Sequence, residues 1–209
     1  MIARAMIFAC GAAIAAYLSF GAAAQGTPDY SALIAAPDRS ADDRATDARR
    51  DPLKMLDLIG ARPGMKVLDM GAGGGYSTEL MARAVGPTGV VFGQNPPNFF
   101  ERATAAFEVR TKTPAGKPMV ALSRPFDDPV AADVHDLDLV TFLFFYHDTT
   151  YMGVDRAKMN AKLFAALAPS HRGAPVASRG RSGGLQVCRR RRFLAPPRGY
   201  AGLHHATTD

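Results

Sequence analysis

Residues 67–77 read VLDMGAGGGYS, in which an apolar run is followed by four glycines within five residues and then by a helical pattern. The apolar run from Met65 to Met70 has glycine on both sides, which predicts a short buried parallel strand. Glycine tolerates positive φ and lets a ligand approach the backbone closely. A strand, a glycine turn and a helix in this order aim backbone N–H groups at a ligand. The segment therefore predicts a ligand site between a strand and a helix.

Strand and helix patterns alternate on both sides of this turn. This alternation predicts an α/β fold with a doubly wound, mostly parallel sheet, and it places the glycine turn at the carboxyl edge, where ligands of open α/β sheets bind. Ser40 and the Asp51-Pro52 pair are typical helix starts, and Gly60 is a typical helix end. The expected helices begin near Ser40 and then cover 52–59, 76–85, 98–109 and 156–167, and the expected strands cover 65–70, 90–92, 119–122 and 138–145.

Within these elements the apolar positions predict which side chains form the core. Leu53, Leu56 and Ile59 form a helical stripe, with Met55 at its margin. Phe99 is expected on the apolar side of the helix over 98–109.

The first 24 residues are typical of a secretory signal peptide. Arg4 is followed by an apolar run from Ala5 to Phe20 and by three alanines before Gln25. The alternatives are a buried helix and an uncleaved anchor, although the run is shorter than the ~20 apolar residues of a comfortable membrane span. We expect an exported, periplasmic protein, and we expect residues 25–50 to form a linker and a leading helix. Of the two cysteines, Cys10 would leave with the signal, so no disulfide framework is expected.

The spacing of the glycines distinguishes between two kinds of ligand that such a turn can bind. A dinucleotide fingerprint needs Gly-x-Gly-x-x-Gly, but the sixth position from Gly71 is Tyr76, so that the segment fits Gly-x-Gly-x-Gly instead. Asp69 precedes the first glycine by two positions. Its carboxylate can either bind a ligand ammonium or order the turn, and the sequence does not decide between these roles.

Strand, acid, GxGxG turn and helix together resemble the class I S-adenosylmethionine-dependent methyltransferases. The resemblance covers residues 51–169 and implies a Rossmann-like fold. More narrowly, four segments are similar to a group of exported bacterial proteins described as methyltransferases: GVVFGQNPP (89–97), DLDLVTF (136–142), YHD (146–148) and MGVDRAKMN (152–160).

The resemblance implies roles for particular residues. Asp69, Gly71, Gly73 and Gly75 would hold the amino-acid end of S-adenosylmethionine. Gln94 and Asn95 stand where the family usually has an acid for the ribose hydroxyls; an amide can bind a diol, but without the strength of a charge-assisted hydrogen bond. Asp127 or Asp128 would lie near the adenine, with a solvated loop carboxylate as the alternative.

Tyr146, His147 and Asp148 follow the fourth expected strand, at the edge that faces the methyl group in the family. They are the candidate catalytic residues. His147 can act as a general base because its ordinary pKa lies near neutrality. Asp148 would orient His147 and Tyr146 would bind the substrate. The alternative is a loop in which His147 only satisfies backbone groups.

The net charge of +6 comes from the end of the chain. Residues 170–209 hold eight of the 25 basic residues and one of the 19 acidic residues, so the rest of the chain is close to neutral. This Arg-rich tail replaces the fifth strand of the family, and the sheet is expected to be incomplete after the fourth strand. We interpret the tail as a frameshift near codon 169; a basic arm and a plain disordered tail are the alternatives.

The favoured function is S-adenosylmethionine-dependent methyl transfer to a small-molecule acceptor, with no nucleic-acid partner and no metal, and with membrane contact only through an uncleaved signal. The incomplete sheet raises the hypothesis that the domain as written is inactive. A non-catalytic binding protein is the first alternative, because the cofactor is made in the cytoplasm. A dinucleotide-binding oxidoreductase is the second. The sequence indicates neither the acceptor nor the oligomeric state.

Overall fold

The computed structural model describes residues 26–170, 177–178 and 186–187. The expected signal peptide and nearly all of the Arg-rich tail lie outside these residues. The helices are α1 (Tyr30–Ala35), α2 (Ala41–Arg50), α3 (Pro52–Ile59), α4 (Tyr76–Val85), α5 (Glu101–Thr111) and α6 (Arg156–Ala166), with 3₁₀ turns η1 (Gly86–Thr88) and η2 (Asp148–Thr150). The strands are β1 (Lys66–Met70), β2 (Val90–Asn95), β3 (Met119–Ser123), β4 (Leu139–Phe142), β5 (Ala177–Ser178) and β6 (Gln186–Val187).

Four parallel strands form the centre of the sheet, in the order β3-β2-β1-β4. Val67 of β1 pairs with Val91 of β2 on one side and with Leu139 of β4 on the other. This arrangement confirms the expected doubly wound α/β fold. Beyond β4 the sequence predicts an open edge, but β6 pairs antiparallel with Thr141 and Phe142, and β5 pairs with β6. The β4 edge is therefore covered over two residues.

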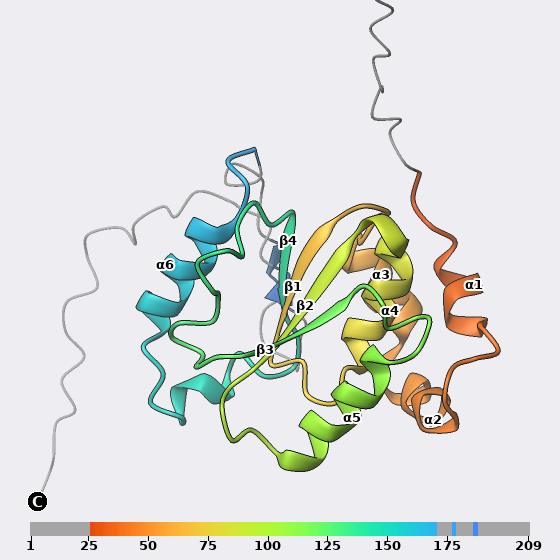
Figure 1. The fold of residues 1–209 in the computed structure, drawn as a ribbon, viewed down its shortest axis with the longest axis horizontal. Coiled ribbons are helices and arrows are strands. Elements are labelled where there is room, and N and C mark those ends of the chain that lie inside the picture. Colours follow the sequence, from red (N-terminus) through yellow and green to blue (C-terminus); the bar gives the residue numbers. More distant parts are fainter. Residues whose placement is uncertain (1–25, 171–176, 179–185, 188–209) are drawn as a thin grey trace, which may run out of the picture.

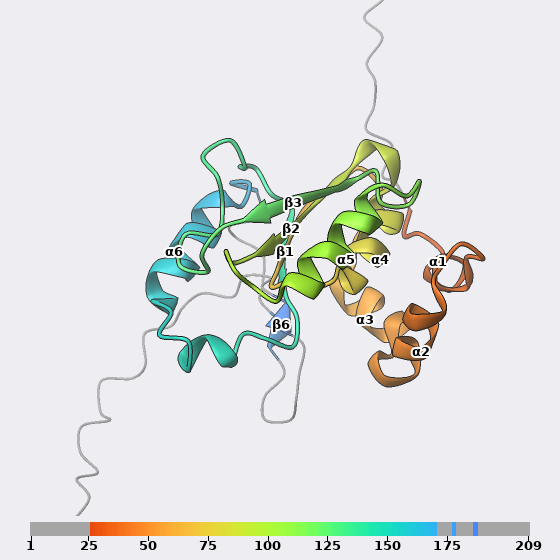
Figure 2. The ribbon, with the colours of Figure 1, turned by 60° about the horizontal axis from the view of Figure 1, so that its bottom comes forward.

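Helices cover both faces of the sheet (Figure 1). The helices α1 to α5 lie on one side and α6 lies on the other, and the view in Figure 2 shows the same layers. Strand residues alternate between the two faces with period two. Val67 and Leu139 belong to the core under α3 and α4, whereas Leu68 and Val140 belong to the core under α6.

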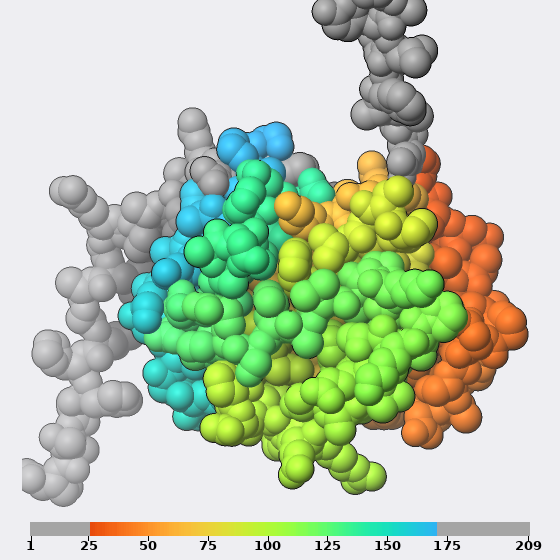
Figure 3. Space-filling model, in the orientation of Figure 1, coloured from red at the N-terminus to blue at the C-terminus, as the bar shows by residue number. Residues whose placement is uncertain are grey.

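The N-terminal helices are part of the domain. The sequence predicts a linker before Ser40, but Tyr30 begins α1 and is 4% exposed. The Tyr30 hydroxyl donates to the carbonyl of Ala61 at 2.8 Å, so a long-range contact that no local pattern shows holds the helix on the domain. In the space-filling view, the residues after Gly26 form a continuous layer on one side of the molecule (Figure 3).

Two expected core positions are corrected by the packing. The sequence predicts Leu53 as a core residue of α3 and Met55 as marginal, but Leu53 is 41% exposed and Met55 is 3% exposed. Pro52 is itself buried at the start of α3, and this rotates the buried face toward Met55, Leu56 and Ile59. Phe99 lies in the turn before α5 and not within the helix.

The expected strand over 138–145 is shorter than its apolar run. β4 ends at Phe142, and Phe144 adopts a φ of +64°. Positive φ is unusual for a bulky residue, and it turns the chain out of the strand direction. Residues 143–145 therefore form a loop at the carboxyl edge of the sheet, beside the glycine turn.

Gly93 of β2 sets how closely α5 packs on the sheet. A Cβ at this position would lie 2.3 Å from the Phe107 ring, which is 2% exposed. We expect Gly93→Ala to lower the free energy of unfolding by about 1–3 kcal/mol, because the ring has to move within a packed core. Urea unfolding followed by circular dichroism measures the change. Adding Phe107→Leu should recover part of the loss, and a cost below about 0.5 kcal/mol for Gly93→Ala would contradict this packing.

Candidate functional site

The glycine turn between β1 and α4 lies at the carboxyl edge of the sheet. Gly71, Gly73 and Gly75 have φ values of +62°, +57° and +86°, which L side chains rarely adopt. A Cβ at Gly71 or Gly75 would come within about 3 Å of neighbouring side chains, whereas a Cβ at Gly73 would meet nothing within 4 Å. Gly71 and Gly75 thus permit close packing, and Gly73 leaves open space above the turn.

Two N–H groups of the turn are bonded to side chains of β2. The Gly71 N–H donates to Gln94 Oε1 at 3.2 Å, and the Gly73 N–H donates to Asn95 Oδ1 at 2.8 Å. The two side-chain amides are completed by bonds to the carbonyls of Arg124 and Gly73. This corrects the expectation that these N–H groups point at a ligand. Gln94 and Asn95, predicted to bind the ribose, fix the turn on β2.

Asp69 orders the turn from below. Its side chain is 1% exposed, and its carboxylate accepts hydrogen bonds from Ser77, Thr78 and Thr141 at 2.7–2.8 Å. Ser77 and Thr78 begin α4, and Thr141 is on β4, so one carboxylate joins three elements. Burial raises the pKa of Asp69, and the three hydroxyl donors oppose that rise. Of the two roles that the sequence left open, the structure shows the ordering role.

The raised pKa of Asp69 predicts a pH dependence of stability. Asp69 ionises at lower pH in the unfolded chain, near pKa ~3.9, than in the folded protein. Its contribution to stability is therefore full below about pH 4 and is lost as the pH rises through the folded-state pKa. We expect Asp69→Asn to become more stable relative to the wild type as the pH is raised from 4 to 7 in urea unfolding experiments.

Asp43→Asn provides a control of opposite sign. Burial opposes ionisation of Asp43, but the hydrogen bonds from Arg110 lower the pKa of this carboxyl below its usual range. Its contribution is present above the unfolded pKa of ~3.9 and is lost as the pH falls through the folded pKa. The two variants should therefore differ from the wild type in separate pH ranges, above and below about pH 4. Parallel pH profiles would contradict the assignment for Asp69.

A cavity of about 530 Å³ lies over the glycine turn. Its size is within the range of about 300–1,000 Å³ that is usual for small-molecule sites. Its wall is formed by the turn itself, by one face of α2 along its length, by α5 and the two residues before it, and by the loop after β4. The lining residues from outside the turn are Asp42, Asp43, Thr46, Arg49, Arg50, Asp69, Tyr76, Ser77, Phe99, Phe100, Ala103, Ala106, Arg110, Leu143, Phe144 and Phe145.

A second cavity, of about 700 Å³, lies beyond the ends of β2 and β3 and against α5. Asn95 and Phe99 are among its lining residues, and Phe99 lines both cavities. The Phe99 ring packs edge-on against Phe145 at 5.6 Å and against Phe126 at 6.5 Å, measured between ring centroids. Phe99 thus forms a wall common to the two cavities, and it is anchored by the aromatic cluster above β4.

The predicted adenine residues lie away from both cavities. Asp127 pairs with Lys158 at 2.9 Å, and Asp128 pairs with Lys162 at 3.1 Å and with Arg124. Both lysines are on α6. In the described structure these carboxylates join the loop after β3 to α6 and line neither cavity.

The predicted catalytic trio also lies outside the cavity walls. His147 Nε2 is 3.1 Å from Asp148 Oδ1, and the His147 side chain is 74% exposed. The Tyr146 hydroxyl accepts a hydrogen bond from Asn160 of α6, and its ring packs edge-on against Phe142. The expected contact between His147 and Asp148 is present, but the structure does not bring the trio to the cavity over the glycine turn.

Residues from α2 and from the loop after β4 were not predicted as site residues. Arg49, Arg50 and Thr46 are separated from the turn by more than twenty residues, and no motif marks them. Phe144 and Phe145 fall within the apolar run that was assigned to a strand. The only available signal was the position of Tyr146 and its neighbours at a strand end, since loops at that edge face the ligand.

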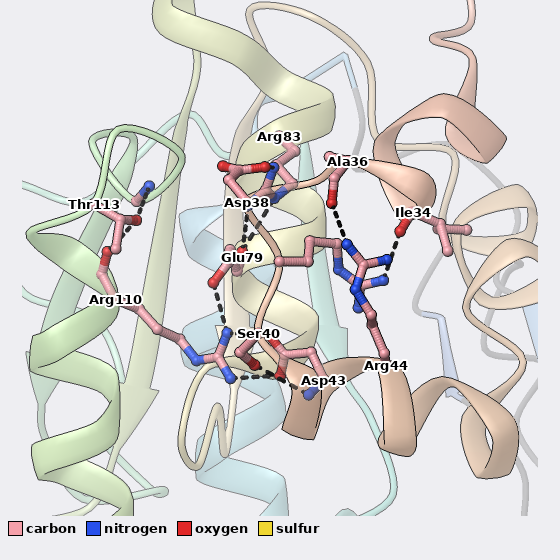
Figure 4. A network of polar contacts seen from close by, with 12 residues as sticks. Ile34, Ala36, Asp38, Ser40, Asp43, Arg44, Glu79, Arg83, Arg110 and Thr113 are labelled. Carbon is pink, nitrogen blue, oxygen red and sulfur yellow. Dashed lines mark hydrogen bonds and ion pairs between the residues drawn. The ribbon is translucent and has the colours of Figure 1, made fainter.

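An ion-pair network joins α5 and α4 to the N-terminal segment that includes α2 (Figure 4). Arg110 of α5 donates through Nε to the Gly74 carbonyl at 2.7 Å and through its terminal nitrogens to Asp43 and Glu79 at 2.6–2.7 Å. Arg83 of α4 pairs with Glu79 and with Asp38. Hydrogen bonding to Asp43 raises the pKa of Arg110, so this guanidinium stays charged. The network fixes one wall of the cavity.

Comparison with known proteins shows which class of protein the segment around the glycine turn resembles. Residues 48–114, about a third of the chain, match the family model of protein-L-isoaspartate(D-aspartate) O-methyltransferase. The matched segment includes β1, the glycine turn, α4, β2 and α5, so this part of the chain is similar to a class I S-adenosylmethionine-dependent methyltransferase. S-adenosylmethionine is the cofactor of this class, and the residues of the turn fit it because Gly73 leaves the space above the backbone open.

The individual relatives are matched over short segments. The chain is 53% identical over 38 residues to protein-L-isoaspartate O-methyltransferase of Methanothrix thermoacetophila, which is 18% of each protein. It is 51% identical over 39 residues to the enzyme of the same name from Aeropyrum pernix, 19% of this chain and 15% of that protein. The chain therefore matches less than a fifth of the length of these curated relatives.

Among solved structures, an S-adenosylmethionine-dependent methyltransferase from Aquifex aeolicus is similar at a TM-score of 0.48 and 22% identity, covering 57% of this chain and 59% of that one. Fibrillarin from Aeropyrum pernix, solved with bound S-adenosyl-L-methionine, is similar at a TM-score of 0.36 and 18% identity, covering 43% of this chain and 40% of that one.

Proposed function

We propose that this protein binds S-adenosylmethionine over the glycine turn and transfers its methyl group to a small-molecule acceptor. The observation that carries the proposal is the Gly71–Gly75 turn, which forms the floor of a cavity of ligand size at the carboxyl edge of the sheet. The chain holds this floor rigid through Asp69, Gln94 and Asn95.

Methyl transfer needs little machinery from the protein. The sulfonium of the cofactor already activates the methyl group, so the protein contributes mainly alignment of the acceptor and exclusion of water. Leu143 and Phe145 of the loop after β4, together with the exposed Phe100, form an apolar part of the cavity wall. We propose that the methyl acceptor binds against this apolar part of the wall. Tyr146, His147 and Asp148 stay a prediction for acceptor binding or proton removal, since they follow that loop directly.

The size of the cavity supports a small-molecule acceptor. Thr46, Arg49 and Arg50 line its α2 side, and its volume of about 530 Å³ is within the usual range of small-molecule sites. The acceptor of the matched family, an isoaspartyl residue in a protein, is the competing possibility, and the test below separates the two.

The first test is calorimetric titration of the full chain with S-adenosylmethionine. Binding with one site per chain is expected, and absence of binding would overturn the proposal. Labelled cofactor is then incubated with the protein and either a low-molecular-weight cell extract or an isoaspartyl peptide. Label transferred only to small molecules supports the proposal, and label on the peptide would correct the acceptor. Cofactor binding without transfer to any fraction would indicate a non-catalytic binding protein.

We also propose that the protein is exported, on the basis of its first 24 residues alone. No helix within the described part of the chain has the length and apolar character needed to cross a membrane. Cell fractionation followed by N-terminal sequencing tests the proposal. A periplasmic protein that begins at Gln25 is expected, and an intact first residue in the cytoplasm would contradict export.

A further inference from the structure

Arg50 is the last residue of α2 and lines the cavity over the glycine turn. The helix ends there because Asp51 adopts the left-handed conformation, with a φ of +45°, and caps the start of α3. The Arg50 side chain is half-buried. Its position in the cavity wall is therefore set by the junction between two helices and not by a free loop.

Two aromatic rings hold the Arg50 guanidinium. Its Cζ lies 4.6 Å from the centroid of Phe144 and 5.4 Å from that of Tyr76. Tyr76 is itself fixed, because its hydroxyl donates to Asp47 at 2.7 Å. Phe144 reaches its place with a positive φ of +64°, a strained conformation for a bulky residue. Stacking on rings positions a guanidinium without using its N–H donors.

Three arginines near the cavity are paired with acids, whereas the exposed Arg49, which also lines it, donates to the Thr46 hydroxyl at 3.3 Å. Arg39 pairs with Asp47 at 2.6 Å, and Arg83 and Arg110 pair with the carboxylates of the network in Figure 4. In contrast, no carboxylate of the described residues forms an ion pair with Arg50. Its donors are available to a ligand, and a guanidinium binds a carboxylate with two parallel hydrogen bonds.

None of the three acids that line the cavity forms an ion pair with Arg50. Asp43 is paired with Arg110, and the buried Asp69 bonds to three hydroxyls, although the charge of Arg50 also opposes the rise of its pKa. Asp42 is exposed at the opposite end of α2, more than two helical turns from Arg50. No described acid is therefore hydrogen-bonded to the guanidinium of Arg50, and its N–H donors can bind an anionic group in the cavity.

We propose that Arg50 binds the carboxylate of the amino-acid end of S-adenosylmethionine, held in place by Tyr76 and Phe144. This inference rests on the proposed function. Arg50 and the glycine turn line the same cavity, and the turn is where the amino-acid end of the cofactor is expected. A carboxylate of the acceptor has the same chemistry, so the experiment is designed to separate the two sources.

The experiment compares two ligands that differ only in the carboxylate. The full chain is titrated by calorimetry with S-adenosylmethionine and with decarboxylated S-adenosylmethionine. The variants are Arg50→Met, which keeps an apolar stem between the rings, and Arg50→Lys, which keeps a charge but not the planar fork. Arg62→Met is the matched control, because Arg62 is an exposed arginine in the turn before β1, at the other edge of the sheet.

We expect Arg50→Met to weaken binding of S-adenosylmethionine by about tenfold to a hundredfold, to leave the decarboxylated ligand within about twofold, and Arg50→Lys to lie between. Arg62→Met should change neither affinity. If the wild type binds S-adenosylmethionine and Arg50→Met binds it equally well, the anion belongs to the acceptor and the inference is overturned while the proposed function stands. Equal weakening of both ligands would also overturn it. A wild type that binds neither ligand would overturn the proposed function itself.

Discussion

Replacement of Arg110 by alanine is expected to destabilise the domain by about 3–5 kcal/mol, the usual cost of removing one partner from a buried ion pair. Asp43 and Glu79 are 6% and 9% exposed at their side chains, so both carboxylates would keep their charge in a poorly solvated position. The Gly74 carbonyl would lose its donor at the same time. The single side chain of Arg110 thus joins α5 to α2, to α4 and to the glycine turn.

Urea unfolding of Arg110→Ala measures the decrease in the free energy of unfolding. An ion pair on the surface provides the reference for comparison. Lys162 pairs with Asp128 with side-chain exposures of 50% and 31%, so Lys162→Ala should cost no more than about 1 kcal/mol. Arg110→Lys should be intermediate, because one ammonium cannot replace a guanidinium that bonds to two carboxylates and a carbonyl. A cost for Arg110→Ala as small as that for Lys162→Ala would show that the network does not stabilise the fold.

A double-mutant cycle of Arg110→Ala with Asp43→Ala measures the interaction energy between Arg110 and Asp43 apart from their other contacts. Once Arg110 is absent, removal of Asp43 should relieve part of the cost, since the buried charge left behind is then gone. The two single substitutions should therefore be strongly non-additive. Additive costs would indicate that Arg110 acts through Glu79 and Gly74 and not through Asp43.

Local rules predicted the elements on which the site is built. The strand at 65–70, the glycine turn and the helix at 76–85 follow from apolar runs and glycine positions, which depend on neighbours in sequence. The caps at Ser40 and Asp51 are also local, and both side chains accept the expected backbone N–H. These features were predictable because each is decided within about four residues.

The contacts that complete the site were not predictable in this way. Gln94 and Asn95 bind the glycine turn across more than twenty residues, and Arg110 reaches Asp43 across 67. A single sequence shows that an amide follows β2 but does not show which backbone group it meets. For the same reason the aspartates after β3 were expected near a ligand, whereas lysines on α6 hold them.

Replacement of Gly73 by aspartate is expected to abolish binding of S-adenosylmethionine while the domain stays folded. Gly73 has a φ of +57°, and a Cβ there would meet no atom within 4 Å. Aspartate is one of the residues that tolerate the left-handed region, so the cost to folding is small. Its carboxylate would enter the cavity over the turn, where the amino-acid end of the cofactor is expected.

Calorimetric titration should show at least about a hundredfold loss of affinity, equivalent to about 2.7 kcal/mol. Gly64→Asp is the matched control. Gly64 has a φ of +79°, its added Cβ would meet only Thr88 Oγ1 at 3.6 Å, and it lies in the turn before β1, at the opposite edge of the sheet. The two variants therefore carry the same new charge and similar backbone strain. Only Gly73→Asp places the new carboxylate in the cavity.

Gly73→Asn separates the effect of charge from that of volume, because the amide has the size of the carboxylate without its charge and tolerates the left-handed region. A small loss for asparagine and a large loss for aspartate would place a negative group of the cofactor beside the turn. Thermal unfolding with and without the ligand gives an independent measure, since a ligand that binds only the folded state raises the melting temperature. Unchanged affinity in a folded Gly73→Asp would exclude the glycine turn as the cofactor site, and the cavity beyond β2 would then be the remaining candidate.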